Sequence, residues 1–501
     1  MTEAYFDVLI VGAGISGIGG AVHLSQKCPG KSFAILEGRA RLGGTWDLFK
    51  YPGIRSDSDM YTLGFEFKPW KEAKAIADAP SILNYLEETV EEFGLAQHIR
   101  LQTRVTSLAW SSEDACWSVT CEVGPDKRVE TLRAGFLYMG TGYYSYTDPY
   151  RPEFEGQADF KGPVIHPQFW PENLDYAGKK VVIVGSGATA VTLVPAMADG
   201  GAGHMTMLQR SPSYIVSRPA EDKIANYLRA VLPSGLAYRL ARWKNIAATR
   251  LLYSRSQAKP QQTKDYIAKQ ARAVLGDDYD VSTHLTPSYN PWDQRMCLIP
   301  DNDMFRVMRE GKADIVTGQI ERFTSNGIKL TDGREIPADI IITATGLKME
   351  LLSGVSVSVD GEAIKLGECI GYKGFMYSGI PNAAVAMGYS NASWTLKADL
   401  VSNYMCRLLN HMDANGLRVA IPDASGVLPI ADPMMNLSSG YVQRALAGLP
   451  KQGDREPFKT HHDYYLDRKN LRHGPLDDHM IFRKGPVAKA AEEREFAEAA
   501  E

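Results

Sequence analysis

Cysteine is scarce in this sequence, and no two cysteines stand at a spacing that suits a metal site. The chain has 501 residues and six cysteines, which are Cys28, Cys116, Cys121, Cys297, Cys369 and Cys406. No CxxC pair occurs among them, so we expect neither a disulfide framework nor a bound metal. Scattered cysteines are typical of proteins in a reducing compartment, and the cytoplasm is therefore the expected location.

Long apolar runs and a strong excess of one charge are also missing. The stretch VLIVGAGISGIGGAVHL, residues 8–24, is too rich in glycine for a membrane span. The N-terminus carries no basic leader, so no signal peptide is expected. The formal net charge of −4 gives no sign of nucleic-acid binding. Apolar residues at 44% and charged residues at 23% are typical of a soluble globular protein.

The segment DVLIVGAGISG, residues 7–17, predicts a strand, a tight turn and the start of a helix. Gly12, Gly14 and Gly17 follow a GxGxxG pattern, and the next apolar strand, SFAILE, ends at Glu37. In a dinucleotide-binding unit these glycines permit the turn, admit the pyrophosphate and let helix and strand pack closely. The helix N-terminus favours the phosphates, and an acid placed like Glu37 accepts hydrogen bonds from a ribose. A tight turn without a ligand is the alternative.

The segment KKVVIVGSGATAVTLV, residues 179–194, repeats this arrangement. Gly185 and Gly187 take the first two glycine positions, and Ala190 takes the third, where a small residue suffices. The following strand ends at Arg210, at the same step from the first glycine as Glu37 in the first module. An arginine there accommodates a 2′-phosphate, whereas an acid favours a free ribose hydroxyl. We therefore expect FAD in the first module and NADPH in the second, unless Arg210 is an ordinary surface residue.

The absence of cysteine from the segment just after the first module narrows the class of flavoprotein. Disulfide reductases need a redox pair soon after the first module, and residues 38–110 contain no cysteine. The segment Gly43-Gly44-Thr45-Trp46 is similar to the second glycine-rich loop that holds FAD in flavoproteins with two dinucleotide sites. What remains is flavin plus NADPH without a thiol relay, which passes a hydride to flavin and lets reduced flavin meet oxygen.

The connector FKGPVIHPQFWP, residues 160–171, matches the fingerprint of type I Baeyer–Villiger monooxygenases through Phe160, Gly162, His166 and Trp170. Related flavin-containing monooxygenases usually carry another aromatic residue at the position of Trp170. Further matching segments are GGTWDLF, YPGIRSDSDMYTLGF, residues 182–195, QRSP, YNPWDQR, DIIITATG and NASWTLKADL. The resemblance covers nearly the whole chain and is closest to the short branch that contains the mycobacterial ethionamide-activating monooxygenase.

This resemblance implies an α/β protein with two Rossmann-like dinucleotide-binding domains, for FAD and NADPH, and a helical insertion. We expect the FAD-binding domain at residues 1–145 and 347–501 and the NADPH-binding domain at residues 150–217 and 293–346. Residues 218–292 fit neither module and predict helices, so they form the expected insertion.

The insertion is strongly basic. Residues 218–275 hold twelve Lys and Arg residues against three Asp and Glu residues, an excess of nine positive charges. One interpretation is a solvated helical unit whose field attracts NADPH. The other is a weak association with a membrane surface through a basic amphipathic face.

By the same resemblance, Arg295 is the residue that serves the oxygenation chemistry. In the family, NADPH reduces FAD, oxygen gives a flavin peroxide, and the peroxide converts a ketone to an ester or lactone. An arginine stays charged at any relevant pH, so it stabilises negative charge throughout the cycle. Its partner in the family maps onto Asp57, which would orient the guanidinium, and Asp59 is a rival. The alternative for this pair is an ordinary salt bridge between domains.

The matched motifs imply further cofactor-binding residues. Many family members carry a lysine just before the arginine, but this chain has Gln294, so NADPH selectivity would depend more on Arg210 and Ser211. A helix N-terminus in residues 389–400 is expected to face the flavin ring. The remaining candidates from these motifs are Thr345, Gly346, Asn391, Trp394 and Thr395.

The connector is expected to act on domain geometry. A buried Trp170 would anchor the crossing between domains through its large surface. His166 would help to set the arrangement of the domains during turnover rather than transfer a proton to substrate. A satisfied structural histidine is the alternative for His166.

The sequence thus predicts an NADPH- and FAD-dependent Baeyer–Villiger monooxygenase that acts on ketones with molecular oxygen and takes sulfides as further substrates. One alternative is a flavin-containing N- or S-monooxygenase, which Trp170 and Arg295 argue against. Another is a non-catalytic FAD redox sensor. The sequence does not determine the size of the substrate or the oligomeric state. Because position 294 is Gln294, it also leaves open how strictly NADPH is preferred to NADH.

Overall fold

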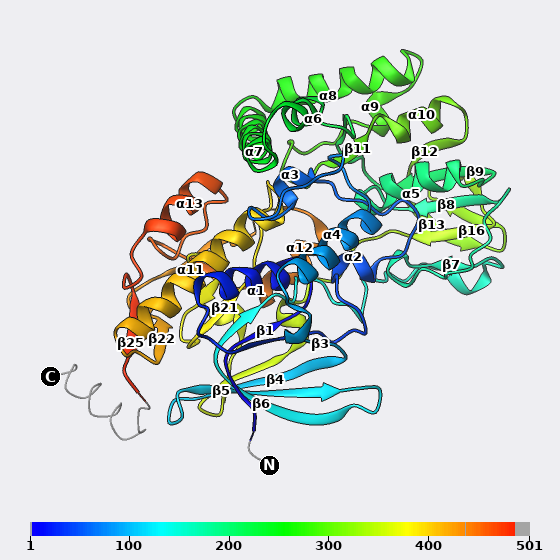
Figure 1. Ribbon diagram of the computed structural model, residues 1–501. Helices are drawn as coiled ribbons and strands as arrows, with labels where there is room; N and C mark the ends of the chain where they lie inside the picture. The colour runs from blue at the N-terminus through cyan, green and yellow to red at the C-terminus, as the bar shows by residue number, and fades with distance from the viewer. Residues whose placement is uncertain (1–2, 436, 486–501) are drawn as a thin grey trace.

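The computed structural model describes residues 3–435 and 437–485 as two α/β modules with a helical insertion (Figure 1). The sheet of the first module runs β18-β17-β4-β5-β6-β1-β2-β3, and β21 also pairs with β6. Its strands are β1 (Tyr5–Val11), β2 (Phe33–Leu36), β3 (Ile99–Arg100), β4 (Thr103–Ser111), β5 (Cys116–Val123), β6 (Arg128–Met139), β17 (Ser356–Val359), β18 (Glu362–Ala363) and β21 (Ala383–Val385).

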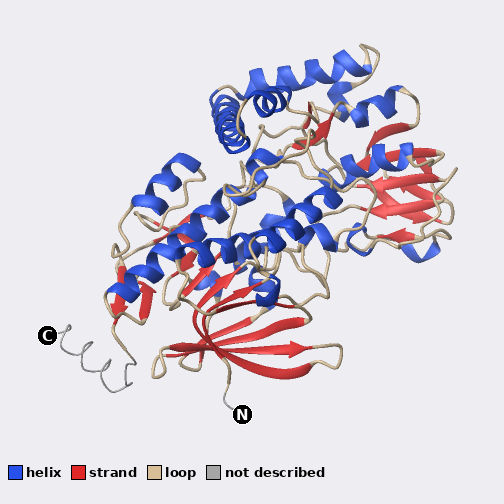
Figure 2. Cartoon of the chain, in the orientation of Figure 1, coloured by secondary structure: helices blue, strands red, loops and turns tan. Residues whose placement is uncertain are grey.

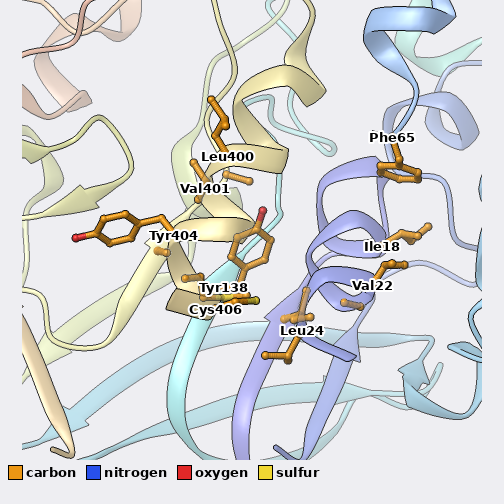
Figure 3. Close-up of a cluster of buried hydrophobic side chains, with 14 of the residues drawn as sticks. Ile18, Val22, Leu24, Phe65, Tyr138, Leu400, Val401, Tyr404 and Cys406 are labelled. Atoms are coloured by element: carbon orange, nitrogen blue, oxygen red, sulfur yellow. The ribbon is translucent and has the colours of Figure 1, made fainter. Parts of the chain in front are cut away.

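Parallel strands form the centre of this first sheet. β1 pairs in parallel with both β2 and β6, and its last four residues are buried, as expected for a strand covered on both faces. The helices α1 (Ile15–Lys27), α4 (Ala79–Glu92) and α11 (Trp394–Ala414) belong to this module, and α1 contacts both α4 and α11. Figure 3 shows the core that α1 and α11 share with β6, through Ile18, Val22, Leu24, Tyr138, Leu400, Val401 and Cys406.

The second module is a smaller parallel sheet in the order β12-β9-β8-β16-β7. Its strands are β7 (Val164–Ile165), β8 (Lys180–Val184), β9 (His204–Gln209), β12 (Ala313–Thr317) and β16 (Ile340–Thr343). The helices α5 (Ala188–Asp199) and α10 (Asp303–Arg309) pack against each other. Between β12 and β16 the chain forms a small antiparallel sheet of β13 (Ile320–Thr324), β14 (Gly327–Leu330) and β15 (Glu335–Pro337). The chain then returns from β16 to the first sheet at β17.

The insertion leaves the second module between two short parallel strands, β10 (Ile215–Arg218) and β11 (Cys297–Pro300). It consists of α6 (Lys223–Val231), α7 (Ser234–Ala258), α8 (Pro260–Leu275) and α9 (Val281–His284). These helices lie together at one outer edge of the molecule, far from the strands of the first sheet (Figures 1 and 2). The helical pattern that the sequence predicts for this region is present.

The remaining elements are short and belong to loops and to the C-terminal part. They are α2 (Thr45–Leu48), α3 (Met60–Leu63), α12 (Gly440–Ala445), α13 (Tyr464–His473), β19 (Gly371–Tyr372), β20 (Met376–Tyr377), β22 (Val419–Pro422), β23 (Pro429–Pro433), β24 (Lys451–Gly453) and β25 (Met480–Arg483), with 3₁₀ turns at 96–98, 157–159, 167–169, 351–354, 366–368 and 446–448. In the part of the chain that the structure describes, no helix has both the length and the apolar character needed to cross a membrane.

Candidate active site

A cavity of about 1110 Å³ lies between the two modules. Both glycine-rich turns border it, as do the segments before β11 and after β16. Sixteen of the residues predicted from the sequence line this cavity, namely Gly12, Gly14, Glu37, Gly44, Thr45, Trp46, Asp57, Gly185, Gly187, Arg210, Ser211, Gln294, Arg295, Thr345, Gly346 and Trp394. The fold therefore gathers most of the candidate residues around one space.

The first glycine-rich turn is shaped by close contacts of the backbone. Gly12 has a φ of +101°, and a Cβ on Gly17 would lie only 1.8 Å from the Gly12 oxygen. Gly14 precedes α1, and a Cβ there would lie 3.5 Å from the Cα of Gly44 in the second glycine loop. The two loops thus meet where a pyrophosphate would approach the start of a helix, and their chemistry fits an FAD.

Glu37 is buried at the end of β2, on the wall of the cavity. Its Oε2 accepts a hydrogen bond from the backbone N–H of Ala13 at 2.8 Å, and Oε1 accepts one from Arg39 at 2.9 Å. Burial raises the pKa of this carboxyl, whereas the two backbone donors oppose that shift. Each carboxylate oxygen has a second lone pair, so Glu37 retains the capacity to accept a ribose hydroxyl.

The second glycine-rich turn is more open. Gly187 precedes α5, and a Cβ on Gly187 would meet no atom within 4 Å. Arg210 follows β9 on the cavity wall, is exposed, and has no hydrogen bond or ion pair within residues 3–435 and 437–485. The neighbouring backbone is held by Ser186, whose hydroxyl donates to the Ser211 carbonyl at 3.2 Å. An unpaired guanidinium beside an open helix start suits a phosphorylated ligand.

Arg295 and Asp57 form a two-pronged ion pair on the cavity wall. Nε of Arg295 donates to Oδ2 of Asp57 at 2.9 Å, and Nη2 donates to Oδ1 at 3.1 Å. Their side chains are 35% and 32% exposed, which leaves the rest of the guanidinium open to the cavity. The carboxylate of Asp57 raises the pKa of Arg295 above its ordinary value, so the guanidinium stays charged. The rival Asp59 instead caps α3, accepting from the Thr62 N–H at 3.1 Å.

An aromatic wall beside Arg295 joins the predicted Trp394 to Tyr143, which the sequence did not indicate. Tyr143 stacks on Trp394 with ring centroids 4.9 Å apart, and Trp394 donates through Nε1 to Ser16 Oγ at 2.8 Å. Burial raises the pKa of Tyr143, which hydrogen-bonds to the hydroxyl of Tyr144. The segment TGYYSY follows β6 at the carboxyl edge of the sheet, and this position could have indicated a site.

The C-terminal part of the chain adds cavity residues that sequence reasoning missed, among them Tyr441 and Arg444. The guanidinium carbon of Arg444 lies 3.5 Å from the ring centroid of Tyr150. Burial raises the pKa of Tyr441, so its hydroxyl stays protonated and able to donate. No local pattern links these residues to the glycine-rich turns, so no signal in the sequence pointed to them.

Six predicted residues lie outside the cavity wall. Gly17 and Ala190 are buried inside α1 and α5, where they serve helix packing. Asn391 donates through Nδ2 to the His462 carbonyl at 3.0 Å, and Thr395 donates through its hydroxyl to the Leu63 carbonyl. The two others are the connector residues His166 and Trp170.

The connector wraps around the edge strand β7. Before β7, Phe160 is buried in the cluster on one side of the second sheet, and after β7, Trp170 packs against the cluster on the other side. A Cβ on Gly162 would lie 2.2 Å from the Asp339 oxygen, which explains the glycine. His166 is buried between them; its Nδ1 accepts from the Gln168 N–H at 3.2 Å.

The second ring nitrogen of His166 is buried, and the backbone of Gly346 on the cavity wall lies close enough to the ring to influence its pKa. Nε2 is buried and has no hydrogen-bond partner among the described residues. Burial, together with the positive charge of Arg151, lowers the pKa of His166 to about 4. The imidazole is therefore neutral near pH 7.

Comparisons with known proteins identify the family. The chain is 51% identical over 488 residues to the FAD-containing monooxygenase EthA of Mycobacterium tuberculosis strain H37Rv, a match that covers 97% of this chain and 99% of the relative. The chain belongs to the FAD-containing monooxygenases. It is 48% identical over 480 residues to the probable FAD-binding monooxygenase AlmA of Acinetobacter baylyi, with 96% of each chain covered. The predictions of a monooxygenase and of FAD as its cofactor are confirmed.

Solved structures and a family model agree with the predicted fold. A steroid monooxygenase bound to NADP superimposes with a TM-score of 0.76 at 23% identity, over 96% of this chain and all of that one. An open form of cyclohexanone monooxygenase superimposes with a TM-score of 0.73 at 19% identity, again over 96% of this chain and all of that one. The pyridine nucleotide-disulphide oxidoreductase family model matches residues 9–236. The predicted α/β fold with two dinucleotide modules and a helical insertion is therefore confirmed.

Proposed function

We propose that this monooxygenase is a Baeyer–Villiger enzyme that uses NADPH and molecular oxygen to convert ketones into esters or lactones. The observation that carries this proposal is the Arg295–Asp57 pair on the wall between the two modules. Among the structural neighbours, one cyclohexanone monooxygenase has epsilon-caprolactone, a lactone, bound. Sulfur oxygenation is the proposed second activity.

Arg295 is proposed as the residue that stabilises negative charge on the reacting oxygen atoms. FAD, when bound, supplies the reactivity of reduced flavin towards oxygen. Arg295 supplies a permanent positive charge, since Asp57 raises its pKa further. Asp57 takes two of its N–H groups and so fixes the plane of the guanidinium, leaving the remaining donors for a carbonyl oxygen. A fixed donor of this kind typically contributes about 3–4 kcal/mol to a transition state.

Cofactor sites are proposed for the two glycine-rich turns. In the first, Gly12, Gly14 and Glu37 bind FAD, and Gly44, Thr45 and Trp46 close its second loop. In the second, the NADPH phosphates lie at Gly185 and Gly187, with the 2′-phosphate at Arg210 and Ser211, which is supported by the unpaired state of Arg210 within the described residues. Gln294, Thr345, Gly346 and Trp394 complete the walls, while Gly17 and Ala190 allow the helices to approach the strands.

The proposed domain division follows these sites. Residues 1–145 and 347–501 bind FAD, residues 150–217 and 293–346 bind NADPH, and residues 218–292 form the insertion; positions 1–2, 436 and 486–501 lie outside the described residues. His166 and Trp170 are proposed to couple the two domains, because the connector is anchored on both faces of the second sheet. Asn391 and Thr395 do not line the cavity; they are proposed to hold the N-terminal end of α11 in place next to the flavin.

The enzyme is further proposed to work in the cytoplasm as a protein peripheral to the membrane. Its proposed partners are molecular oxygen and a small ketone or sulfide, without nucleic acid. Membership of the FAD-containing monooxygenases argues against a non-catalytic redox sensor. Oxygenation of nitrogen and sulfur alone is the second candidate function.

The test uses the FAD-loaded enzyme with NADPH, oxygen and a panel of linear, cyclic and aromatic ketones, with an aryl methyl sulfide in parallel. NADPH consumption and products are measured together. Ester or lactone from at least one ketone class, in proportion to the NADPH consumed, is the expected result. Sulfoxide without ester from any ketone would replace the Baeyer–Villiger assignment by heteroatom oxygenation.

A further inference from the structure

Exposed apolar side chains gather on the insertion. Within the part of the chain that the structure describes, eight of the fifteen exposed large apolar side chains lie on α6, α7 and α8. Trp243 is 64% exposed and Leu251 is 70% exposed. The eight side chains are Ile224, Tyr227, Val231, Leu236, Leu240, Trp243, Leu251 and Tyr266. A surface of this kind is more than the scatter of single apolar residues that is usual on soluble proteins.

The spacing of these residues places them on one face of each helix. On α6, Ile224, Tyr227 and Val231 follow the helical repeat, while Ala225 on another side of the helix is buried. On α7, Leu236, Leu240, Trp243 and Leu251 also follow that repeat, and the buried face carries Ala237, Tyr238, Ala241 and Arg242. Both helices therefore turn a row of apolar side chains outwards, away from the side that is buried.

The buried face of α7 is firmly attached to the first module. Arg242 donates through Nη1 to the carbonyls of Tyr61 at 2.8 Å and Gly64 at 2.7 Å, and through Nη2 to Asp399 at 3.2 Å. Tyr238 donates to the Phe65 carbonyl at 2.8 Å. Because these contacts fix the orientation of α7, the outward apolar face is a stable feature of the surface.

Several basic side chains on the same helices have no partner among the residues that the structure describes. Arg239 stands one position before Leu240 on α7, Lys223 opens α6, and Arg255 lies in the last turn of α7. Six exposed basic side chains make no hydrogen bond or ion pair with any described residue, namely Lys223, Arg239, Arg255, Lys259, Lys269 and Arg272. Lys223, Arg239 and Arg255 lie on the same two helices as the apolar faces of α6 and α7, and with those faces they form what we term the basic apolar face.

We propose that the basic apolar face binds the surface of a bilayer that contains anionic lipids. The apolar side chains would enter the boundary between headgroups and acyl chains, and the unpaired Lys and Arg side chains would bind lipid phosphates. This inference deepens the proposed peripheral location and does not depend on the reaction. No described helix could span a bilayer, so the contact lies on the membrane.

Charge decides between a bilayer and a second copy of the chain as the occupant. Six exposed basic side chains of the insertion have no partner among the described residues, so two copies of this face would repel each other. An anionic surface is attracted by the same charges, at a free energy that grows with each Lys or Arg brought near it. An apolar face without charges would suit a homodimer interface. The positive charges around this face disfavour such an interface.

The test measures sedimentation of the full FAD-loaded enzyme with vesicles, without NADPH or ketone. Vesicles of phosphatidylcholine alone are compared with vesicles that also contain phosphatidylglycerol. We expect at least about tenfold stronger partition onto the anionic vesicles, decreasing as salt is raised. Equal partition onto both vesicle types, or onto neither, would overturn the proposal. Because no turnover is involved, failure here leaves the proposed reaction untouched.

Two double variants separate the apolar and the charged contributions. L240S/W243S should weaken partition by roughly 100-fold, because two large apolar side chains no longer leave water. R239Q/R255Q should weaken it by about 30-fold through the loss of two charges. Unchanged partition of both variants would overturn the proposal, as would a dimer in the unmodified protein that L240S/W243S dissociates.

Matched controls come from apolar residues that are equally exposed elsewhere. Val129 on β6 is 69% exposed and Leu428 is 66% exposed, and neither lies near the insertion in sequence. V129S and L428S should partition like the unmodified enzyme. Bound FAD and the thermal midpoint, measured for every variant, show that a change in partition does not result from unfolding.

Discussion

At the scale of single residues, the site depends on pairs that join distant parts of the chain. Arg295 and Asp57 are 238 positions apart, yet two hydrogen bonds hold them in one plane. An arginine in such a pair keeps both its charge and its orientation, which a lysine could not provide because it lacks the planar fork. Asp59, two residues further on, is used as a helix cap and is not available to Arg295.

Replacing Arg295 by alanine should separate NADPH oxidation from ester formation. R295A should retain FAD and still oxidise NADPH, but ester formation should fall by about 10²–10³-fold because a donor on the reacting oxygen is lost. The measurement is ester formed per NADPH consumed. R322A is the control, since Arg322 is a partly exposed arginine paired with Asp159 outside the cavity wall. Near-normal ester formation in R295A would remove Arg295 from this role.

Reversing the charge at position 210 should change the choice of nicotinamide. In R210D the carboxylate would repel a 2′-phosphate, so kcat/KM for NADPH should fall by on the order of 100-fold while that for NADH changes little. The comparison of the two coenzymes is the measurement, and R309D, an exposed arginine of α10 outside the cavity wall, is the control. Equal losses for both coenzymes would contradict the assignment.

At the scale of elements, the glycine-rich units could be predicted because each is local. A strand, a glycine turn and a helix in one short segment specify both β1–α1 and β8–α5. The wall formed by Tyr143, Trp394 and Tyr441 could not be predicted in this way, since its members meet only in three dimensions. At the start of α11, neighbouring side chains point in different directions, so the motif alone did not show which of them line the cavity.

The helical repeat explains which residues at the start of α11 reach the cavity. Successive residues of a helix point about 100° apart, so Trp394 and Thr395 cannot face the same space. Trp394 lines the cavity, whereas the hydroxyl of Thr395 binds the Leu63 carbonyl. Asn391, just before the helix, donates a hydrogen bond to the His462 carbonyl and does not line the cavity. Sequence motifs locate the element, but side-chain direction depends on its exact register.

Damage to the connector should disturb coupling and leave cofactor binding intact. His166 lies between two anchors on opposite faces of the second sheet and outside the cavity wall. H166A should keep FAD and the fold, yet release more hydrogen peroxide per NADPH, because domain rearrangements act through such remote segments. NADPH consumed, peroxide released and ester formed are measured in parallel. An unchanged ratio of ester to NADPH would mean that His166 is only structural.

Acid should destabilise the protein in part through the same histidine. The pKa of His166 is lowered from 6.5 to about 4 in the folded state, so the unfolded chain binds more protons between these values. Stability then rises with pH from about 4 to 6.5 and falls as pH is lowered through that window, by up to about 3 kcal/mol from this group. In H166Q the thermal midpoint should fall less between pH 6.5 and pH 4. Identical acid sensitivity of both proteins would contradict the lowered pKa.

At the scale of the whole molecule, the loop that carries Asp57 is clamped between the modules. Tyr51 packs against the core of the second module, and a Cβ on Gly53 would lie 2.5 Å from the Ala196 side chain on α5. Arg55 donates to Asp303 of α10 at 2.5 Å. The position of Asp57, and through it that of Arg295, therefore depends on how the two modules sit against each other.

Removing Arg55 should loosen this clamp without touching the cavity wall. The Arg55–Asp303 pair is mostly buried, with exposed side-chain fractions of 14% and 20%, so R55A leaves a carboxylate poorly compensated at the contact between modules. If the modules must keep Asp57 aligned during turnover, R55A should oxidise NADPH at a similar rate while its ratio of ester to NADPH falls several-fold. R306A is the matched control, because Arg306 lies on the same helix and binds Asp199 within the second module. A loss of coupling in R55A but not in R306A would tie the chemistry at Arg295 to the contact between modules. Equal behaviour of the two variants would show that the clamp has no part in coupling.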